Sequence, residues 1–531
     1  MRFVLVIEVI SLINWLWFIQ NLVNCVSTIY EKEIEPLYWM KVSQQELRDR
    51  LGRKALRVGN VAENAIIMIG DGMGITTVTA GRIYMGQRLI KNGQNVDGES
   101  YKTAMEQMPN LGLARTYSID YQTTDSAASA TAYLCGIKSR SGTIGVDGRC
   151  LRSQCSSCTE ESYVNSVLKR AHMSGKWTGI VTNTRVTHAS PAGAYAHIPE
   201  RYWESFDGIS FNQSHFDQGC RDIADQLVNN GSFLNVVFGG GLSNFLPNDN
   251  SSKYGNGSRV DSVDLIEKWL FLHRKKSKRR STTKYAFINN LEDFNKLKPP
   301  INHVLGLFAP SHMNFADENA NAQPSLASMT QKAIEILSKS PKGYVLFVEG
   351  GLIDVAHHHA QTGRALDEFV NFDEAVERVV NLVDTSKTMI VVSADHSHVF
   401  SIGANSFRNS DILGYASNSL MNASDVDNKP IFILEYGNGP GYVKTNTRLN
   451  ENHWLEWKRS RSSINKSKRL KYPSALPLKT ETHGGEDVPV YSDGPGSYLL
   501  SGTFEHNLIA NAVAHSLCIS PYDKEIHCED D

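Results

Sequence analysis

The chain has 531 residues, a net charge of −2 and a pI of about 6.8. This near-neutral balance excludes a protein whose whole surface attracts nucleic acid, and a hydrophobic content of 41% is ordinary for a globular protein. The length suits one large α/β domain with insertions or several domains.

Residues 1–27 predict a secretory signal peptide. One basic residue, Arg2, precedes an apolar run that Glu8 and Asn14 interrupt, and a small-residue site follows at 25–27. A membrane-spanning helix needs about 20 predominantly apolar residues. Because Glu8 weakens that alternative, we expect cleavage near position 27 and a secreted, extracellular protein.

Sequons and cysteines also indicate secretion. In an oxidising compartment, six of the seven cysteines beyond the signal peptide can pair and one stays a thiol. Cys518 and Cys528 are close enough in sequence to close a C-terminal loop, and the other pairings stay open. The N-x-S/T sequons are at Asn212, Asn230, Asn250, Asn256, Asn422 and Asn465.

Two buried strands are predicted in the first part of the chain, at 65–69 and 179–182. A glycine turn with Asp71 follows the first strand, and the second leads to His188 and Ser190. Each strand therefore ends at side chains of the kind that bind metal ions.

Between these strands, 123–132 predicts a helix of small residues that begins at Asp125 or Ser126. Either residue can simply be the N-cap. A serine at a helix N-terminus also has free backbone N–H groups and a positive dipole end, which suit a phosphate oxyanion. No G-x-S-x-G segment is present, so we expect a metal to activate this serine.

The segment 344–359 has the densest group of candidate ligands. Its first five residues are apolar and predict a strand buried on both faces, which Glu349 and a glycine turn follow. Asp354 and His358 are four residues apart, so they share one face if this segment is helical. Their carboxylate and imidazole suit zinc, whereas Glu349 suits magnesium.

Helices are predicted at 326–338 and, from an apolar stripe of 3.6-residue period, over about 366–383. A further strand, 388–392, leads to Asp395 and His396. Alternating strands and helices indicate a mainly parallel sheet covered on both faces. Ligands of such sheets gather at the carboxyl ends of the strands. We therefore expect one crevice that contains Asp71, His188, Ser190, Glu349, Asp354, His358, Asp395 and His396.

Six segments resemble the signature segments of animal alkaline phosphatases, in that family's order: IMIGDGMG, TTDSAASATAYLCG, TRVTHASPAG, FVEGGLIDVAHHH, SADHSHVF and ETHGGED. The resemblance runs from about Glu33 to Cys528. It implies a three-layer α/β/α sandwich, with a core formed by 28–404 and 479–531 and a small crown subdomain inserted at 405–478. It also implies a homodimer.

The resemblance further implies metal-dependent hydrolysis of phosphate monoesters through a phosphoserine intermediate, with a broad range of small or macromolecular substrates. Ser126 is implied as the nucleophile and Arg201 as the phosphate clamp. Two zinc ions and one magnesium ion per subunit are implied. The implied ligands are Asp71, Asp395 and His396 for one zinc, Asp354, His358 and His483 for the other, and Asp71, Ser190 and Glu349 for magnesium, with His188 in its outer shell.

One metal site of the family is expected to be missing. Ala309 and Gln323 stand where vertebrate members have carboxylates of a calcium site. Because calcium draws much of its affinity from carboxylate charge, no calcium site is expected. Asp317 and Glu318 lie near these positions in the sequence, and their carboxylates could replace the missing calcium ligands.

Two basic segments and the C-terminus complete the pattern. Segment 273–280 contains six Lys or Arg residues and is expected to be an exposed inserted loop, and 458–471 is basic within the crown. Both predict weak binding of anionic glycans rather than nucleic-acid specificity. The sequence ends at Asp531 without the hydrophobic tail of a GPI signal, so a freely secreted form is expected.

Two other functions are weighed against this one. A catalytically weak binding protein on the same scaffold would be favoured by loss of Ser126, Asp71 or His358, and all three are present. A sulfatase or phosphodiesterase of the same superfamily is disfavoured, because the segment at the serine lacks the Cys/Ser-x-Pro-x-Arg pattern of sulfatases.

Overall fold

The structure is a computed structural model that describes residues 34–53, 61–91, 98–279, 284–319, 322–416, 431–442 and 468–528. The predicted signal peptide, two sequons (Asn422 and Asn465) and most of 458–471 lie outside these ranges. Within the described ranges, every helix is too short or too polar to span a bilayer.

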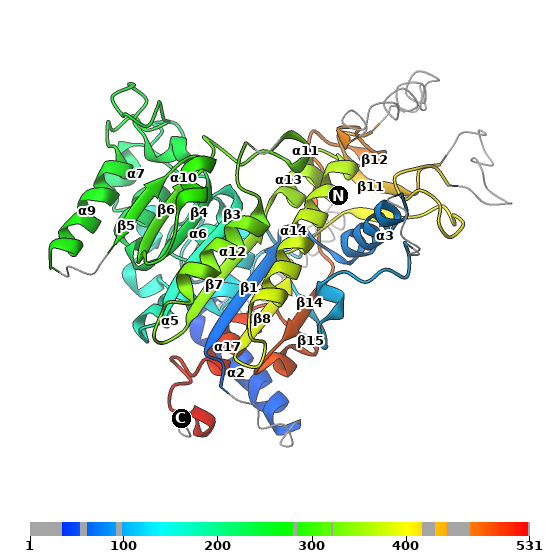
Figure 1. Ribbon diagram of the computed structural model, residues 1–531, viewed down its shortest axis with the longest axis horizontal. Coiled ribbons are helices and arrows are strands. Elements are labelled where there is room, and N and C mark those ends of the chain that lie inside the picture. Colours follow the sequence, from blue (N-terminus) through cyan, green and yellow to red (C-terminus); the bar gives the residue numbers. More distant parts are fainter. Residues whose placement is uncertain are drawn as a thin grey trace, which may run out of the picture.

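A ten-stranded sheet forms the middle layer (Figure 1). Its strands are β1 (Asn64–Gly70), β2 (Asn110–Arg115), β3 (Trp177–Arg185), β4 (Val236–Gly240), β5 (Tyr285–Ile288), β6 (His303–Leu307), β7 (Tyr344–Gly350), β8 (Thr388–Ser393), β14 (Val488–Asp493) and β15 (Gly502–Glu505). The order is β15-β2-β14-β8-β1-β7-β3-β4-β6-β5. Only β14 runs antiparallel to its neighbours among these strands, so the sheet is mixed and mainly parallel, as predicted.

The central strands are buried on both faces, as their unbroken apolar runs predict. In β1, Ile67 lies between Phe347 of β7 and Val391 of β8, and all three are fully buried. Strand β7 extends two residues beyond the predicted run, because parallel pairing with β1 continues to Gly70 opposite Gly350. Glu349 is therefore held within the strand rather than in the turn.

Helices form the outer layers. They are α2 (Pro36–Arg53), α3 (Ile75–Lys91), α4 (Ser126–Ala130), α5 (Val167–Met173), α6 (Ala189–Ala192), α7 (Gln213–Asp217), α8 (Ile223–Asn229), α9 (Leu265–Arg279), α10 (Leu291–Lys296), α11 (Ala316–Asn319), α12 (Leu326–Leu337), α13 (Leu352–His358), α14 (Thr362–Leu382) and α17 (Leu508–Ser516). In Figure 1, α12 and α14 lie side by side in front of the central strands, and α17 lies behind them. The two helices predicted before and after the central strand are confirmed as α12 and α14.

Two smaller sheets lie beyond the carboxyl ends of the main strands. Strands β10 (Phe400–Ile402), β11 (Leu434–Gly439) and β12 (Ser474–Pro477) form one, and β9 (Ser397–His398) pairs with β13 (His483–Gly484) in the other. The three-stranded sheet draws two strands from the predicted crown segment, 405–478. The exact bounds of that subdomain stay a prediction.

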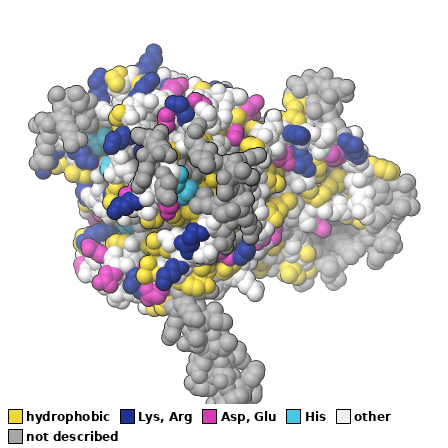
Figure 2. Space-filling view, turned by 90° about the horizontal axis from the view of Figure 1, so that it is seen from below, with side chains coloured by type: hydrophobic (Ala, Val, Ile, Leu, Met, Phe, Trp, Pro, Cys, Tyr) yellow, Lys and Arg dark blue, Asp and Glu magenta, His cyan; other side chains and the backbone are white. Residues whose placement is uncertain are grey.

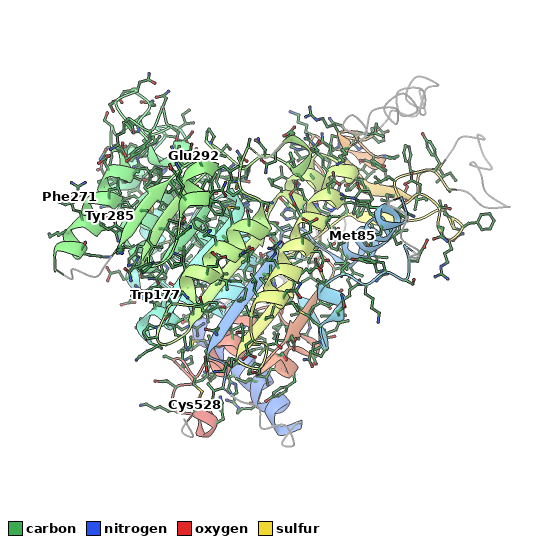
Figure 3. The ribbon with its side chains drawn as sticks, viewed as in Figure 1. Met85, Trp177, Phe271, Tyr285, Glu292 and Cys528 are labelled. Carbon is green, nitrogen blue, oxygen red and sulfur yellow. A yellow bond between two sulfur atoms is a disulfide. The ribbon has the colours of Figure 1, made fainter. Side chains whose placement is uncertain are left out.

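Three disulfides join six cysteines: Cys150 to Cys158, Cys155 to Cys220, and Cys518 to Cys528. Cys135 is a buried free thiol. The predicted count of six paired cysteines and one thiol is confirmed, as is the closed C-terminal loop, whose Cys528 lies at the foot of the molecule in Figure 3.

The expected exposed loop at 273–280 is wrong. Residues 273–279 belong to helix α9, and His273 is fully buried, with its ring 4.2 Å from that of Trp269. Residues 269 and 273 are four apart and share the inward face of the helix, which leaves Arg274 and Lys275 exposed. On the face shown in Figure 2, Lys and Arg side chains are interspersed with Asp and Glu, in keeping with the small net charge.

Candidate metal and phosphate site

The predicted ligand residues lie at the carboxyl ends of four adjacent strands. The order β8-β1-β7-β3 places these ends side by side at the upper edge of the sheet in Figure 1. Asp71 follows β1, Glu349 lies within β7, and Asp395 follows β8. Strand β3 leads through a short turn to His188. The four segments therefore meet where ligands bind in parallel α/β sheets.

The carboxylate half of the site consists of Asp71, His188, Ser190 and Glu349. Ligand atoms of Asp71, His188 and Glu349 lie within 4.8 Å of one another, and Ser190 Oγ donates to Asp71 Oδ2 over 3.4 Å. Burial, reinforced by neighbouring carboxylates, raises the pKa of Asp71 well above its ordinary value. Burial also raises the pKa of Glu349 to about 7. This half concentrates buried negative charge, which a cation would stabilise.

The imidazole half consists of Asp354, His358, His398 and His483. Asp354 Oδ1 lies 2.8 Å from His398 Nε2, 3.4 Å from His358 Nε2 and 3.5 Å from His483 Nε2. The predicted shared face of Asp354 and His358 is confirmed on α13. Burial opposes ionisation of Asp354, but His358 and then His398 outweigh it and hold the pKa of the carboxyl group well below its ordinary value.

Backbone carbonyls set the orientation of two of these rings. His358 Nδ1 lies 2.6 Å from the carbonyl oxygen of Glu481, and His483 Nδ1 lies 2.9 Å from that of Thr124. A carbonyl oxygen only accepts, so each Nδ1 carries the proton. Both Nε2 atoms, which lie 3.2 Å apart, then present lone pairs to the same space. This is the arrangement in which histidines bind a metal ion.

Ser126 lies between the two halves. It is the first residue of α4 and is fully buried, and its Oγ lies 3.4 Å from His396 Nε2. His396 Nε2 lies 3.1 Å from Asp395 Oδ2, and the His396 ring stacks on that of His483 with a centroid separation of 3.5 Å. The candidate nucleophile therefore touches a residue that connects the two groups of ligands.

Asp125, not Ser126, caps helix α4. Its carboxylate accepts from the backbone N–H groups of Ala128 (3.3 Å) and Gly142 (3.0 Å). It also accepts from Arg201 Nη1 over 2.9 Å, while Arg201 Nη2 lies 3.4 Å from His188 Nε2. Burial opposes ionisation of Asp125, but the Arg201 guanidinium outweighs it and lowers the pKa. The ion pair fixes Arg201 beside the serine and the carboxylate half.

Four buried atoms of the site have no hydrogen-bond partner among the described residues: Asp71 Oδ1, Glu349 Oε1, Asp395 Oδ2 and His188 Nδ1. The second oxygen of Glu349 accepts from the hydroxyl groups of Thr182 and Thr184. Free carboxylate oxygens and an imidazole nitrogen are ligands that zinc and magnesium take in proteins. The donor set therefore fits metal ions.

All eleven residues predicted for the site lie within this connected group. The sequence reasoning missed three residues that contact the predicted ones. The Asp125 carboxylate accepts a hydrogen bond from Arg201, and His398 lies between Asp354 and Glu481 and contacts both. A signal was present, since each of the three lies inside a motif segment quoted for the resemblance. Its meaning depended on distances that the sequence does not give.

Where the carboxylates of the family's calcium site are expected to be missing, the side-chain amide of Gln323 forms hydrogen bonds with backbone groups. Gln323 Nε2 donates to the carbonyl oxygen of Phe308 (3.3 Å), and Gln323 Oε1 accepts from the N–H group of Asn314 (2.9 Å). The two nearby carboxylates, Asp317 and Glu318, both pair with Arg364 and with Arg469. Two guanidinium groups thus balance the two carboxylate charges.

A family model described as alkaline phosphatase matches residues 62–519 of the chain. The human tissue-nonspecific isozyme of alkaline phosphatase is 39% identical over 501 residues, which cover 93% of this chain and 90% of that protein. An alkaline phosphatase of the cod Gadus morhua is 38% identical over 497 residues, covering 92% of this chain and 98% of that protein.

Solved structures agree with these relatives. The cold-active alkaline phosphatase of a Shewanella species aligns with a TM-score of 0.58 at 25% identity, covering 86% of this chain and 99% of that one. The enzyme of the Antarctic bacterium TAB5 aligns with a TM-score of 0.57 at 21% identity and supports the fold alone. A variant of the TAB5 enzyme has magnesium bound in its M3 site.

Proposed function

The chain belongs to the alkaline phosphatase family and is a metal-binding hydrolase of phosphate monoesters, and from that premise we propose the residues that carry its reaction. Ser126 is the nucleophile. The single observation that carries this assignment is its position at the start of α4, 3.4 Å from His396 Nε2 and between the two groups of ligands.

We propose two zinc ions and one magnesium ion per subunit. Asp71, Asp395 and His396 would hold one zinc, Asp354, His358 and His483 the other, and Asp71, Ser190 and Glu349 the magnesium, with His188 beyond it. When bound, the metals would lower the pKa of the serine hydroxyl and neutralise charge on the attacking and leaving oxygens. The mixed carboxylate and imidazole donors support this assignment.

In the proposed reaction, Ser126 Oγ loses its proton to solvent and forms a bond to phosphorus while the ester P–O bond breaks, and the leaving alkoxide takes a proton from water, so the number of protons is conserved. Water then attacks the phosphoserine, which releases inorganic phosphate and restores the hydroxyl group. The Arg201 guanidinium donates two hydrogen bonds to non-bridging phosphate oxygens, and Asp125 keeps its fork in place. The protein thus supplies positioning and charge neutralisation.

A comparison of two substrates tests the proposal. Purified protein is incubated with p-nitrophenyl phosphate and with bis(p-nitrophenyl) phosphate, with and without a chelator. We expect hydrolysis of the monoester, loss of activity with the chelator, and recovery with zinc plus magnesium. Faster hydrolysis of the bis-ester would indicate a phosphodiesterase, and no hydrolysis of either would favour the binding-protein alternative.

We also propose that the chain is secreted and forms a homodimer. Three disulfides and the surface positions of Asn230, Asn250 and Asn256 support an oxidising, glycosylating compartment. The dimer is supported by the resemblance to the family. N-terminal sequencing of protein from the culture medium tests the first proposal, and light scattering coupled to gel filtration tests the second.

A further inference from the structure

A second cavity, of about 770 Å³, lies near the amino ends of β4 and β6, and none of the eleven predicted site residues lines it. Its walls come from α5 and the residues before it, the segment 193–197 after α6, the end of α8, the C-terminal part of α9 and the start of β6. His303 is the first residue of β6, and Phe233 precedes β4, so the cavity opens where these parallel strands begin. Its volume is in the range of about 300–1,000 Å³ that is usual for small-molecule sites.

The wall of this cavity is basic. It includes Lys169, Lys276, His172, His197 and His303, and no Asp or Glu lines it. Within the described ranges, no carboxylate pairs with either lysine. Lys169 Nζ lies 4.7 Å from the ring centroid of Phe233, and Lys276 Nζ donates to the carbonyl oxygen of Ser232 over 3.3 Å.

The positive charges of the two lysines act on the histidines of the wall by lowering their pKa values. Burial, and then the charges of Lys169 and Lys276, lower the pKa of His172. Burial lowers the pKa of His303 to about 4, and Lys276 adds to this effect. Positive potential in the cavity therefore disfavours protonation, and a bound anion would relieve it.

The remaining wall suits a sugar. Amide groups of Asn165 and Asn229 offer hydrogen bonds, and the buried Phe233 ring, 5.4 Å from that of His172, offers an apolar face. A bare inorganic anion would leave most of the volume unfilled. We propose that this cavity binds a saccharide that carries sulfate groups. Sulfate is favoured over phosphate because a phosphate ester would be a substrate of the same enzyme.

Calorimetry with a sulfated disaccharide derived from heparin tests this proposal on the full chain loaded with metals. Lys169→Ala and Lys276→Ala are each expected to weaken binding about tenfold, since each removes one charged contact. Lys296→Ala is the matched control, because Lys296 is exposed on α10 and pairs with Glu292. An unsulfated disaccharide is expected not to bind.

Two further variants distinguish binding in this cavity from binding at the phosphate site and from occupation of the cavity by an attached glycan. Arg201→Ala should weaken inhibition by inorganic phosphate yet leave disaccharide binding intact, whereas the lysine variants should do the reverse. Asn230 lines the cavity within a sequon, so Asn230→Gln is measured in parallel to remove any attached glycan. The proposal is overturned if neither form binds the sulfated disaccharide, if the lysine variants bind it unchanged, or if Arg201→Ala abolishes binding.

Discussion

The two halves of the candidate site balance their buried charge in different ways. In the imidazole half, Asp354 is surrounded by His358, His398 and His483, and its pKa is lowered. In the carboxylate half, Asp71 and Glu349 face further carboxylates, and both pKa values are raised. In the imidazole half, the described side chains largely neutralise the carboxylate, whereas the carboxylate half keeps buried acidic groups that they do not neutralise. The two halves therefore differ in how much a bound cation would stabilise them.

The largest expected effect is on kcat and comes from changing Ser126, which lies between the two halves. Ser126→Ala removes the proposed nucleophile without opening a large cavity, so kcat should fall about 10³-fold or more while the melting temperature changes little. Single-turnover kinetics and phosphoserine trapping measure this. Ser129→Ala is the control: its buried hydroxyl donates to the Asp125 carbonyl oxygen but lies one turn away. Equal activity loss in both variants would refute the assignment.

Removing the metals should destabilise the carboxylate half most. Burial raises the pKa of Glu349 to about 7, whereas an unfolded glutamate titrates near 4.3. At Glu349, the folded metal-free chain then binds more protons than the unfolded chain between these values. The contribution of Glu349 to stability should therefore fall as pH rises from about 4.5 to 7, on the order of 2 kcal/mol.

Thermal unfolding of the chelated protein across this pH range measures the effect. The chelated Glu349→Gln variant should lack this contribution, because the amide does not titrate, and the difference between the two chains separates it from the titration of buried histidines. The metal-loaded protein should lack this contribution, since a bound cation favours the ionised carboxylate. An identical pH dependence of stability in the two chelated chains would contradict the contrast between the two halves.

A smaller effect, on zinc affinity, is expected from changing His398, which contacts Asp354 in the imidazole half. His398 Nε2 lies 2.8 Å from Asp354 Oδ1, and its Nδ1 contacts Glu481 Oε2. His398→Ala should lower zinc affinity about 10- to 100-fold, as loss of such supporting contacts commonly does. Competition with a chromophoric chelator measures this. His359→Ala, an exposed histidine beside the ligand His358, is the control and should leave zinc affinity unchanged.

No effect of calcium on stability is expected, because carboxylates of the family's calcium site are missing at Ala309 and Gln323. Calcium titration of the zinc- and magnesium-loaded protein should not shift the melting temperature, because the Gln323 amide already donates to the Phe308 carbonyl oxygen and Ala309 has no side-chain oxygen. Differential scanning calorimetry checks this. A rise in melting temperature with calcium would show that Asp317 and Glu318 leave Arg364 to bind the ion.

The strand ends were predictable because they follow a local rule. An apolar run, an acidic residue and a glycine turn mark the carboxyl ends of β1 and β7, and apolar runs that lead to Asp395 or to His188 mark those of β8 and β3. Family order then identified distant partners such as Arg201 and His483. The supporting contacts were not predictable in this way. His398 meets Glu481 across 83 residues, and the proton position on His358 follows from a carbonyl oxygen. The buried face of α9 was likewise hidden by the basic residues around His273.

The pairing of β9 with β13 has a consequence for biosynthesis. His483 reaches the site because it lies opposite His398 in this short ribbon, yet Asp71 precedes it by most of the chain. A ribosome that has released the first ligand must still make hundreds of residues before the last one emerges. The nascent polypeptide therefore holds an incomplete ligand set throughout most of its translation. The proposed ligand set is complete only once His483 has been made, so enzymatic activity reports that translation has passed this residue.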